Sequence, residues 1–147
     1  MEFISFADRH EVIARTETRG VELGEQNEWG IPPGHYAFFE SFCIDDACDC
    51  RKVMVTIFQI EPQQIVATIG YGWERAEFYT AWMYGDEEMG SLLAGSYLEP
   101  GGQQSVTAVQ WLDLWERKII ADETYRARIC EHYRIFKKQN GSNHTKL

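Results

Sequence analysis

Three of the four cysteines in this chain lie within eight residues, in the stretch CIDDACDC that runs from Cys43 through Cys48 to Cys50. Thiolates are soft ligands that favour zinc, and a structural zinc ion takes four ligands in a tetrahedron. A turn over the residues between Cys43 and Cys48 would direct the three sulfur atoms toward one point. The spacing therefore predicts a metal site, with zinc as its cofactor.

The fourth ligand is sought in the last predicted helix, which Asp122 can cap and which runs to about Lys138. Helical periodicity places Tyr125, Ile129 and His132 on one face of this helix. Cys130 lies about 100° around the helix from Ile129. If that face packs on the sheet, the histidine points toward the cysteine turn. The prediction is a Cys3His site made of Cys43, Cys48, Cys50 and His132, with Cys130 as the alternative fourth ligand.

Other chemistry competes for the same residues. The thiols are alternatively free core residues, a disulfide, ligands of an iron–sulfur cluster, or a nucleophile with His132 as its base. Neighbouring aspartates disfavour a thiolate, which argues against the nucleophile. A shell of four protein ligands leaves no position for a substrate, so the structural role is the preferred prediction.

The CDC fragment resembles the SEC-C type of zinc-binding motif, which also contains C-x-C. The second cysteine or histidine pair of that motif is absent here, because RKVMVTIF is followed by Gln59 and Ile60. The resemblance covers three residues, and no function is carried over from it.

Length and composition indicate one globular domain over residues 1–138, followed by a polar, disordered tail over residues 139–147. Of the 147 residues, 44% are hydrophobic, which is enough for one packed core. The net charge of −9 argues against nucleic acid or an anionic membrane as a partner. The sequence shows neither a signal peptide nor a membrane-spanning run, which predicts a cytoplasmic, reducing location.

The elements that must position the cysteines are strands in the first half of the chain. Residues 35–42, 52–60 and 65–73 alternate or run apolar and are separated by short turns, which predicts an antiparallel meander of about three strands. A short helix is expected within residues 6–17, with Phe6, Val12 and Ile13 facing inward. Two further helices are expected within residues 74–84 and 86–95. A third begins at Ser105 and carries an apolar stripe of Val109, Leu112, Trp115 and Ile119, and the last begins at Asp122. Strands followed by helices are typical of an α+β domain.

The predicted function is a small non-enzymatic module, a protein-interaction or adaptor domain that uses its acidic surface. The alternative is a metal- or thiol-dependent enzyme that uses the cysteine cluster and His132. Trp111 and Val109 cannot face the same side of a helix, so one of them is expected to meet a partner subunit, as in a homodimer.

Overall fold

The computed structural model describes residues 2–145, with side chains as far as Lys138. Its strands form one antiparallel sheet and are β1 (Phe3–Ser5), β2 (Arg19–Leu23), β3 (Gly34–Cys43), β4 (Lys52–Gln59), β5 (Gln64–Gly72) and β6 (Gly95–Leu98). Its helices are α1 (Phe6–Arg9), α2 (Glu11–Glu17), α3 (Ala76–Trp82), α4 (Glu87–Leu93), α5 (Ala108–Leu114), a π-helical turn η1 (Trp115–Ile119) and α6 (Glu123–Thr145). The α+β class predicted from the sequence is confirmed.

The sheet is larger than the predicted meander. Strands β3, β4 and β5 are antiparallel neighbours, as expected, but the sheet has six strands in the order β1-β3-β4-β5-β6, with β2 also paired to β3. The three strands that the prediction missed have five residues or fewer. Such short segments carry too little alternation to be told from loops, and their pairing with β3 and β5 is what orders them.

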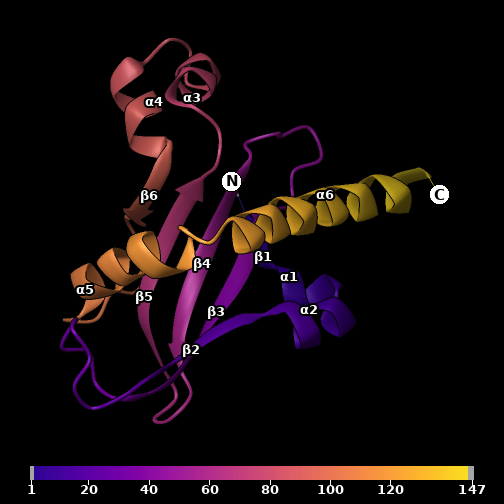
Figure 1. The fold of residues 1–147 in the computed structure, drawn as a ribbon. Coiled ribbons are helices and arrows are strands. Elements are labelled where there is room, and N and C mark those ends of the chain that lie inside the picture. The colour runs from indigo at the N-terminus through magenta and orange to yellow at the C-terminus, as the bar shows by residue number, and fades with distance from the viewer. Residues whose placement is uncertain (1, 146–147) are drawn as a thin grey trace.

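The two helices α5 and α6 cover one face of the sheet (Figure 1). Strand residues alternate between faces, and β3 sends Tyr36, Phe38 and Phe42 to the covered side, where all three are buried. Trp111 of α5 packs on Tyr36, and Phe136 of α6 packs on Phe42. Burial of these aromatic rings is therefore what holds the helices on the sheet.

The π-helical turn sets which residues of the α5 region face the core. The amide of Ile120 donates to the carbonyl of Trp115, a five-residue step. Trp111, Trp115 and Ile119 are all buried, whereas Val109 is 70% exposed. The predicted place of Val109 in the buried stripe was wrong, because Trp111, the larger apolar side chain, takes the core position.

The N-terminal segment forms two short helices instead of the single one predicted. Phe6 is buried as expected, but Val12 is 78% exposed, and the expectation that it faces inward was wrong. The break falls at His10, whose backbone is not helical. Because α1 and α2 are separate helices, Phe6 of α1 can reach the core while the outer side of α2 faces solvent.

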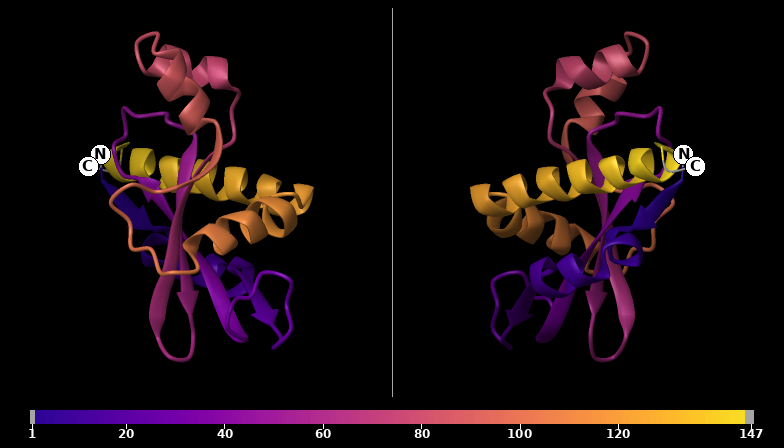
Figure 2. Two further views of the ribbon diagram at one scale, coloured as in Figure 1. Left: turned by 90° about the vertical axis from the view of Figure 1, so that its left-hand side faces the viewer. Right: turned by 90° about the vertical axis from the view of Figure 1, so that its right-hand side faces the viewer.

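Helices α3 and α4 form a hairpin that projects beyond the ends of β5 and β6 (Figures 1 and 2). Asp86 caps α4 by accepting from the amide of Met89 at 3.0 Å. The two helices cross closely at Gly90, where an added Cβ would lie 2.7 Å from the backbone nitrogen of Thr80. Absence of a side chain at Gly90 is thus required by the crossing.

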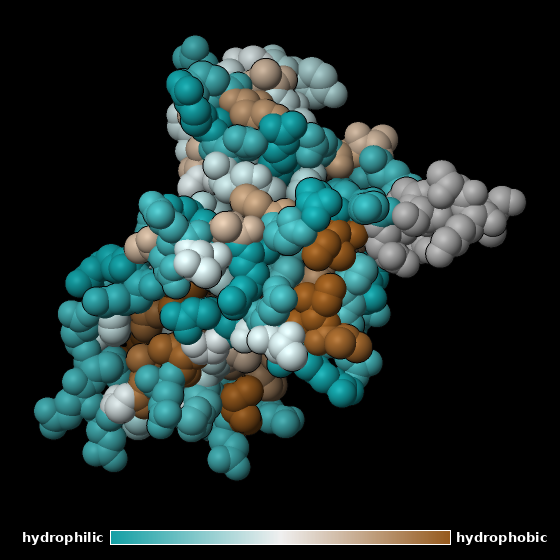
Figure 3. Space-filling view, turned by 45° about the vertical axis from the view of Figure 1, so that its right-hand side comes forward, coloured by the Kyte–Doolittle hydropathy of each residue, from teal (hydrophilic) through white to brown (hydrophobic). Residues whose placement is uncertain are grey.

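The surface is mostly hydrophilic in the view of Figure 3, and apolar side chains form small, separate groups. The backbone of α6 continues past the predicted end near Lys138 as far as Thr145. Side chains of residues 139–147 lie outside the described part of the chain, and the disordered tail stays a prediction.

We expect Gly90→Ala to destabilise the protein by about 1–3 kcal/mol, because the methyl group overlaps the backbone of α3. Intrinsic helix propensity alone would favour alanine by about 1 kcal/mol, so the sign of the change tests the crossing. Urea unfolding measures the effect. Gly24→Ala is the control, since nothing lies within 4 Å of its added Cβ. A neutral or stabilising Gly90→Ala would contradict the described contact between α3 and α4.

Candidate functional site

The connection from β3 to β4 brings the three clustered cysteines together. Cys43 is the last residue of β3, and Cys50 lies two residues before β4; both side chains are buried, while that of Cys48 is partly exposed. The amide of Cys48 donates to the carbonyl of Asp45 at 3.0 Å, and the amide of Ala47 donates to the Asp45 carboxylate. This tight turn directs Cys48 back toward Cys43 and Cys50.

The three thiols influence one another electrostatically. Burial, followed by Cys50 and Cys43, raises the pKa of Cys48 to about 12. Burial also raises the pKa of Cys50, and a hydrogen bond from the backbone amide of Lys52 opposes that rise. Without a cation the cluster therefore favours neutral thiols. Because a metal ion binds thiolates, any metal bound here would have to displace their protons.

Helix α6 anchors the cysteine turn. The Tyr133 hydroxyl donates to Asp49 Oδ1 at 2.7 Å and accepts from the amide of Arg51 at 3.3 Å. Lys137 Nζ donates to the carbonyls of Cys43 and Asp45 at 2.7 and 3.0 Å. The last helix and the cysteine turn are thus joined by hydrogen bonds of Tyr133 and Lys137, whereas the sequence predicted a link through His132 as a metal ligand.

Arg51 fixes the exit of the turn into β4. Its backbone has a φ of 49°, which is uncommon for a residue with a side chain. Its guanidinium pairs with Asp49 and Glu74, both at 2.9 Å, and its carbonyl accepts from the Tyr79 hydroxyl at 2.7 Å. The hydrogen bond from Arg51 lowers the pKa of Asp49, so this aspartate stays ionised beside the cysteines.

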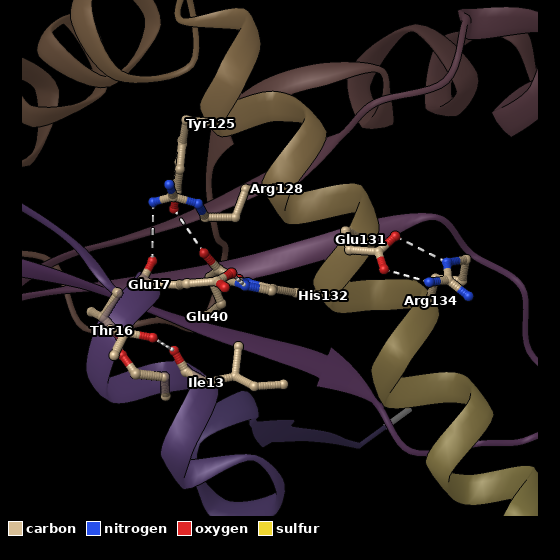
Figure 4. Close-up of polar contacts among 11 residues, drawn as sticks. Ile13, Thr16, Glu17, Glu40, Tyr125, Arg128, Glu131, His132 and Arg134 are labelled. Atoms are coloured by element: carbon tan, nitrogen blue, oxygen red, sulfur yellow. Dashed lines mark hydrogen bonds and ion pairs between the residues drawn. The ribbon is translucent and has the colours of Figure 1, made fainter.

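His132 lies in a different network (Figure 4). Its Nδ1 is 2.7 Å from Glu40 Oε1, its Nε2 is 2.7 Å from Glu17 Oε1, and its ring stacks on Phe6 with centroids 4.3 Å apart. Both ring nitrogens are therefore engaged by carboxylates. The prediction that His132 points toward the sheet is confirmed, but the structure brings it to Glu40 and not to the three cysteines.

The sequence marked Glu40, with His35 and Glu74, as a polar residue near the end of a predicted strand that could line a pocket, but it did not pair Glu40 with His132. Glu40 occupies the inward position between Phe38 and Phe42 on β3, where its side chain is 4% exposed. Besides His132 it accepts a hydrogen bond from the Tyr125 hydroxyl at 3.0 Å. Its signal was present in the sequence, since a glutamate in an otherwise apolar alternation needs a buried partner.

Cys130, the alternative fourth ligand, is not among the groups that shift the pKa values of Cys48 and Cys50. Its thiol is partly buried, and burial and then Glu74 raise its pKa. Among the residues that the structure describes, no group of three or more His, Cys, Asp or Glu side chains is arranged to hold a metal ion as it stands. The four-ligand zinc site therefore stays a prediction, with three of its residues close together.

The comparisons with known proteins add no relative. Neither protein-family models, nor curated proteins, nor solved structures gave a match to this chain. Within residues 2–145, no helix is both long and apolar enough to cross a membrane. The chemistry of the described residues is of two kinds: soft sulfur donors in the turn between β3 and β4, and a histidine bound by carboxylates between α2, β3 and α6.

We expect Tyr133→Phe to destabilise the protein by about 1–2 kcal/mol, because it removes two hydrogen bonds that join α6 to the cysteine turn. Urea denaturation gives the free energy of unfolding. Tyr84→Phe is the matched control, since Tyr84 is 99% exposed. Equal effects of the two substitutions would show that the hydroxyl of Tyr133 does not hold the turn.

We also expect slow alkylation of Cys48 at pH 8 in metal-free, reduced protein. The thiolate is the nucleophile, and a pKa of about 12 reduces its fraction roughly a hundredfold or more relative to an unperturbed cysteine. The rate with iodoacetamide can be followed by mass spectrometry of the peptide, with urea-unfolded protein as the reference. Alkylation at the unfolded rate would contradict the described shielding of this thiol.

Proposed function

We propose that the chain is a small interaction domain, working in the cytoplasm, in which Cys43, Cys48 and Cys50 bind one zinc ion in a structural role. The convergence of these three side chains on one turn carries the proposal. His132 is not part of the proposed ligand set, because carboxylates engage both of its ring nitrogens. Cys130 is left out of the set because it is not among the groups that shift the pKa values of Cys48 and Cys50.

The chemistry around the turn supports a thiophilic cation. Thiolate-rich sites select zinc among the common divalent ions. The Lys52 amide already donates to the sulfur of Cys50, as an amide does to a metal-bound thiolate. Asp45, Asp46 and Asp49 add negative charge to the same turn. As the thiols stand they are not arranged to hold a metal ion, so their side chains would have to rearrange for zinc to bind.

A metal-dependent enzyme is the second candidate, and one observation favours it. Three protein ligands leave a fourth coordination position for water or a substrate. Against this, Cys43 and Cys50 are both fully buried, which leaves little access to a bound ion. A fourth position filled by water within a closed turn fits a structural ion better than a catalytic one.

The proposed role in protein interaction is supported by the net charge of the chain and by one exposed apolar side chain on α5. A net charge of −9 disfavours phosphate backbones and anionic membranes, which leaves a protein as the proposed partner. On α5, Val109 is exposed next to the buried Trp111, so Val109 is the one of the pair that would meet a second subunit if the chain forms a homodimer.

We expect about one zinc ion per chain in protein purified under reducing conditions without added metal or a metal-binding tag, as measured by elemental analysis. Cys48→Ser and Cys50→Ser should lose most of this zinc, because each removes a proposed ligand. Cys130→Ser is the matched control and should keep it.

Two outcomes would count against the site. One is metal-free wild-type protein with all four thiols reduced. The other is equal loss of zinc in Cys130→Ser and Cys48→Ser. Stoichiometric iron in place of zinc would direct the search toward redox chemistry instead.

A further inference from the structure

The hydrogen bonds around His132 determine how many protons its ring must carry. Each ring nitrogen lies 2.7 Å from a carboxylate oxygen, of Glu40 on one side and of Glu17 on the other (Figure 4). An ionised carboxylate only accepts hydrogen bonds, so each of these contacts needs a proton on the ring. A neutral imidazole carries one proton and can satisfy one contact. With both glutamates ionised, the described geometry requires the doubly protonated ring.

The two contacts differ in how easily they can be broken. The side chain of Glu40 is 4% exposed and is also held by Tyr125, so its charge has no access to water. The side chain of Glu17 is 43% exposed at the end of α2. If His132 loses one proton, the remaining proton is expected to stay with Glu40, and Glu17 is released to solvent.

Four charged or titratable groups act on this ring: Glu40 of β3, Glu17 of α2, Glu131 of α6, and His10 between α1 and α2. A second set lies around them, with Arg9 beside His10 and with Arg19 and Arg128 acting on Tyr125, which binds Glu40. Burial lowers the pKa of His132, but the hydrogen bonds and charges of Glu40 and then Glu17 outweigh it, so the pKa lies above 6.5. Burial, Arg9 and His132 lower the pKa of His10, which therefore loses its charge at a lower pH than His132.

Helix α2 has few apolar attachments to the rest of the molecule. Ala14 is the one buried residue of this helix, and Ile13 packs partly buried against the core. By contrast α1 is anchored through Phe6, which is 3% exposed and packs on both His132 and Phe42. At its end, Glu17 binds His132 through the side chain, and its carbonyl accepts a long hydrogen bond of 3.4 Å from Arg128. The contact between Glu17 and His132 is thus the main polar attachment of α2.

We propose that Glu17, His132 and Glu40 form a pH-sensitive latch, which holds α2 against α6 when the ring carries two protons and releases α2 when it carries one. A cavity of about 10 Å³ beside His132, lined also by Ser5, Ala14 and Thr18, lies under this helix and would open to solvent on release. The latch is independent of the proposed zinc site, since no residue is shared.

The direction of the pH effect follows from linkage. His132 binds its second proton more tightly in the folded chain than in the unfolded chain. The stabilisation is therefore complete below pH 6.5 and is lost as the pH rises through the folded-state pKa. For each unit by which that pKa exceeds 6.5, protection of the α2 amides from hydrogen exchange should fall about tenfold.

The test is an NMR titration of the full chain from pH 5.5 to 9. In the wild-type protein the ring signal of His132 should titrate above pH 6.5, and the amide signals of Glu11–Glu17 should follow with the same midpoint. In Glu17→Gln the amide side chain can donate to the deprotonated Nε2 or accept from the protonated one, so these signals should no longer follow His132. Glu11→Gln is the matched control, because Glu11 bonds to Arg15 on the exposed side of α2.

Three results would overturn the latch. The first is titration of His132 at or below pH 6.5. The second is an α2 whose amide signals stay constant while His132 titrates. The third is Glu17→Gln protein in which the α2 signals still follow His132 as they do in the wild type.

Discussion

A single buried carboxylate organises this molecule. Glu40 projects from β3 into the face that the helices cover, between the aromatic rings of Phe38 and Phe42. A charge in that position is tolerated when it is paired and fully hydrogen-bonded. His132 and Tyr125 of α6 are those partners. The position of α6 on the sheet therefore satisfies the hydrogen bonds that the buried Glu40 needs.

The same helix carries the polar contacts of the cysteine turn. On the same helix, Tyr133 directly follows His132 and binds Asp49 in the segment between β3 and β4. Lys137, one turn after Tyr133, binds the carbonyl of Cys43, and Phe136 packs on Phe42. Helix α6 therefore presents a histidine to the buried acid and a tyrosine and a lysine to the turn. Any movement of α6 would disturb both places, which couples the thiol cluster to the core although no ligand links them.

Much of the fold could be predicted because its signals are local. Apolar alternation over residues 52–60 and 65–73 identified β4 and β5, and Asp122 marked the start of α6, where its carboxylate accepts from the amide of Thr124. The short strands β1, β2 and β6 could not be predicted, because they gain their order from pairing with longer strands. The π-helical turn over Trp115–Ile119 could not be predicted either, because apolar periodicity does not distinguish it from a turn of α-helix.

For the candidate site, the sequence by itself determined which side chains are available and that Cys43, Cys48 and Cys50 share one turn, since eight residues can bring three thiols together without any long-range contact. It also determined that His132 lies on the inward face of its helix. Only the tertiary structure decided what His132 meets there, because the packing of α6 on the sheet brings the ring to Glu40 in the middle of β3, whereas Cys43 lies at the end of that strand. A carboxylate bound the ring because a buried charge requires a partner more strongly than a thiol does.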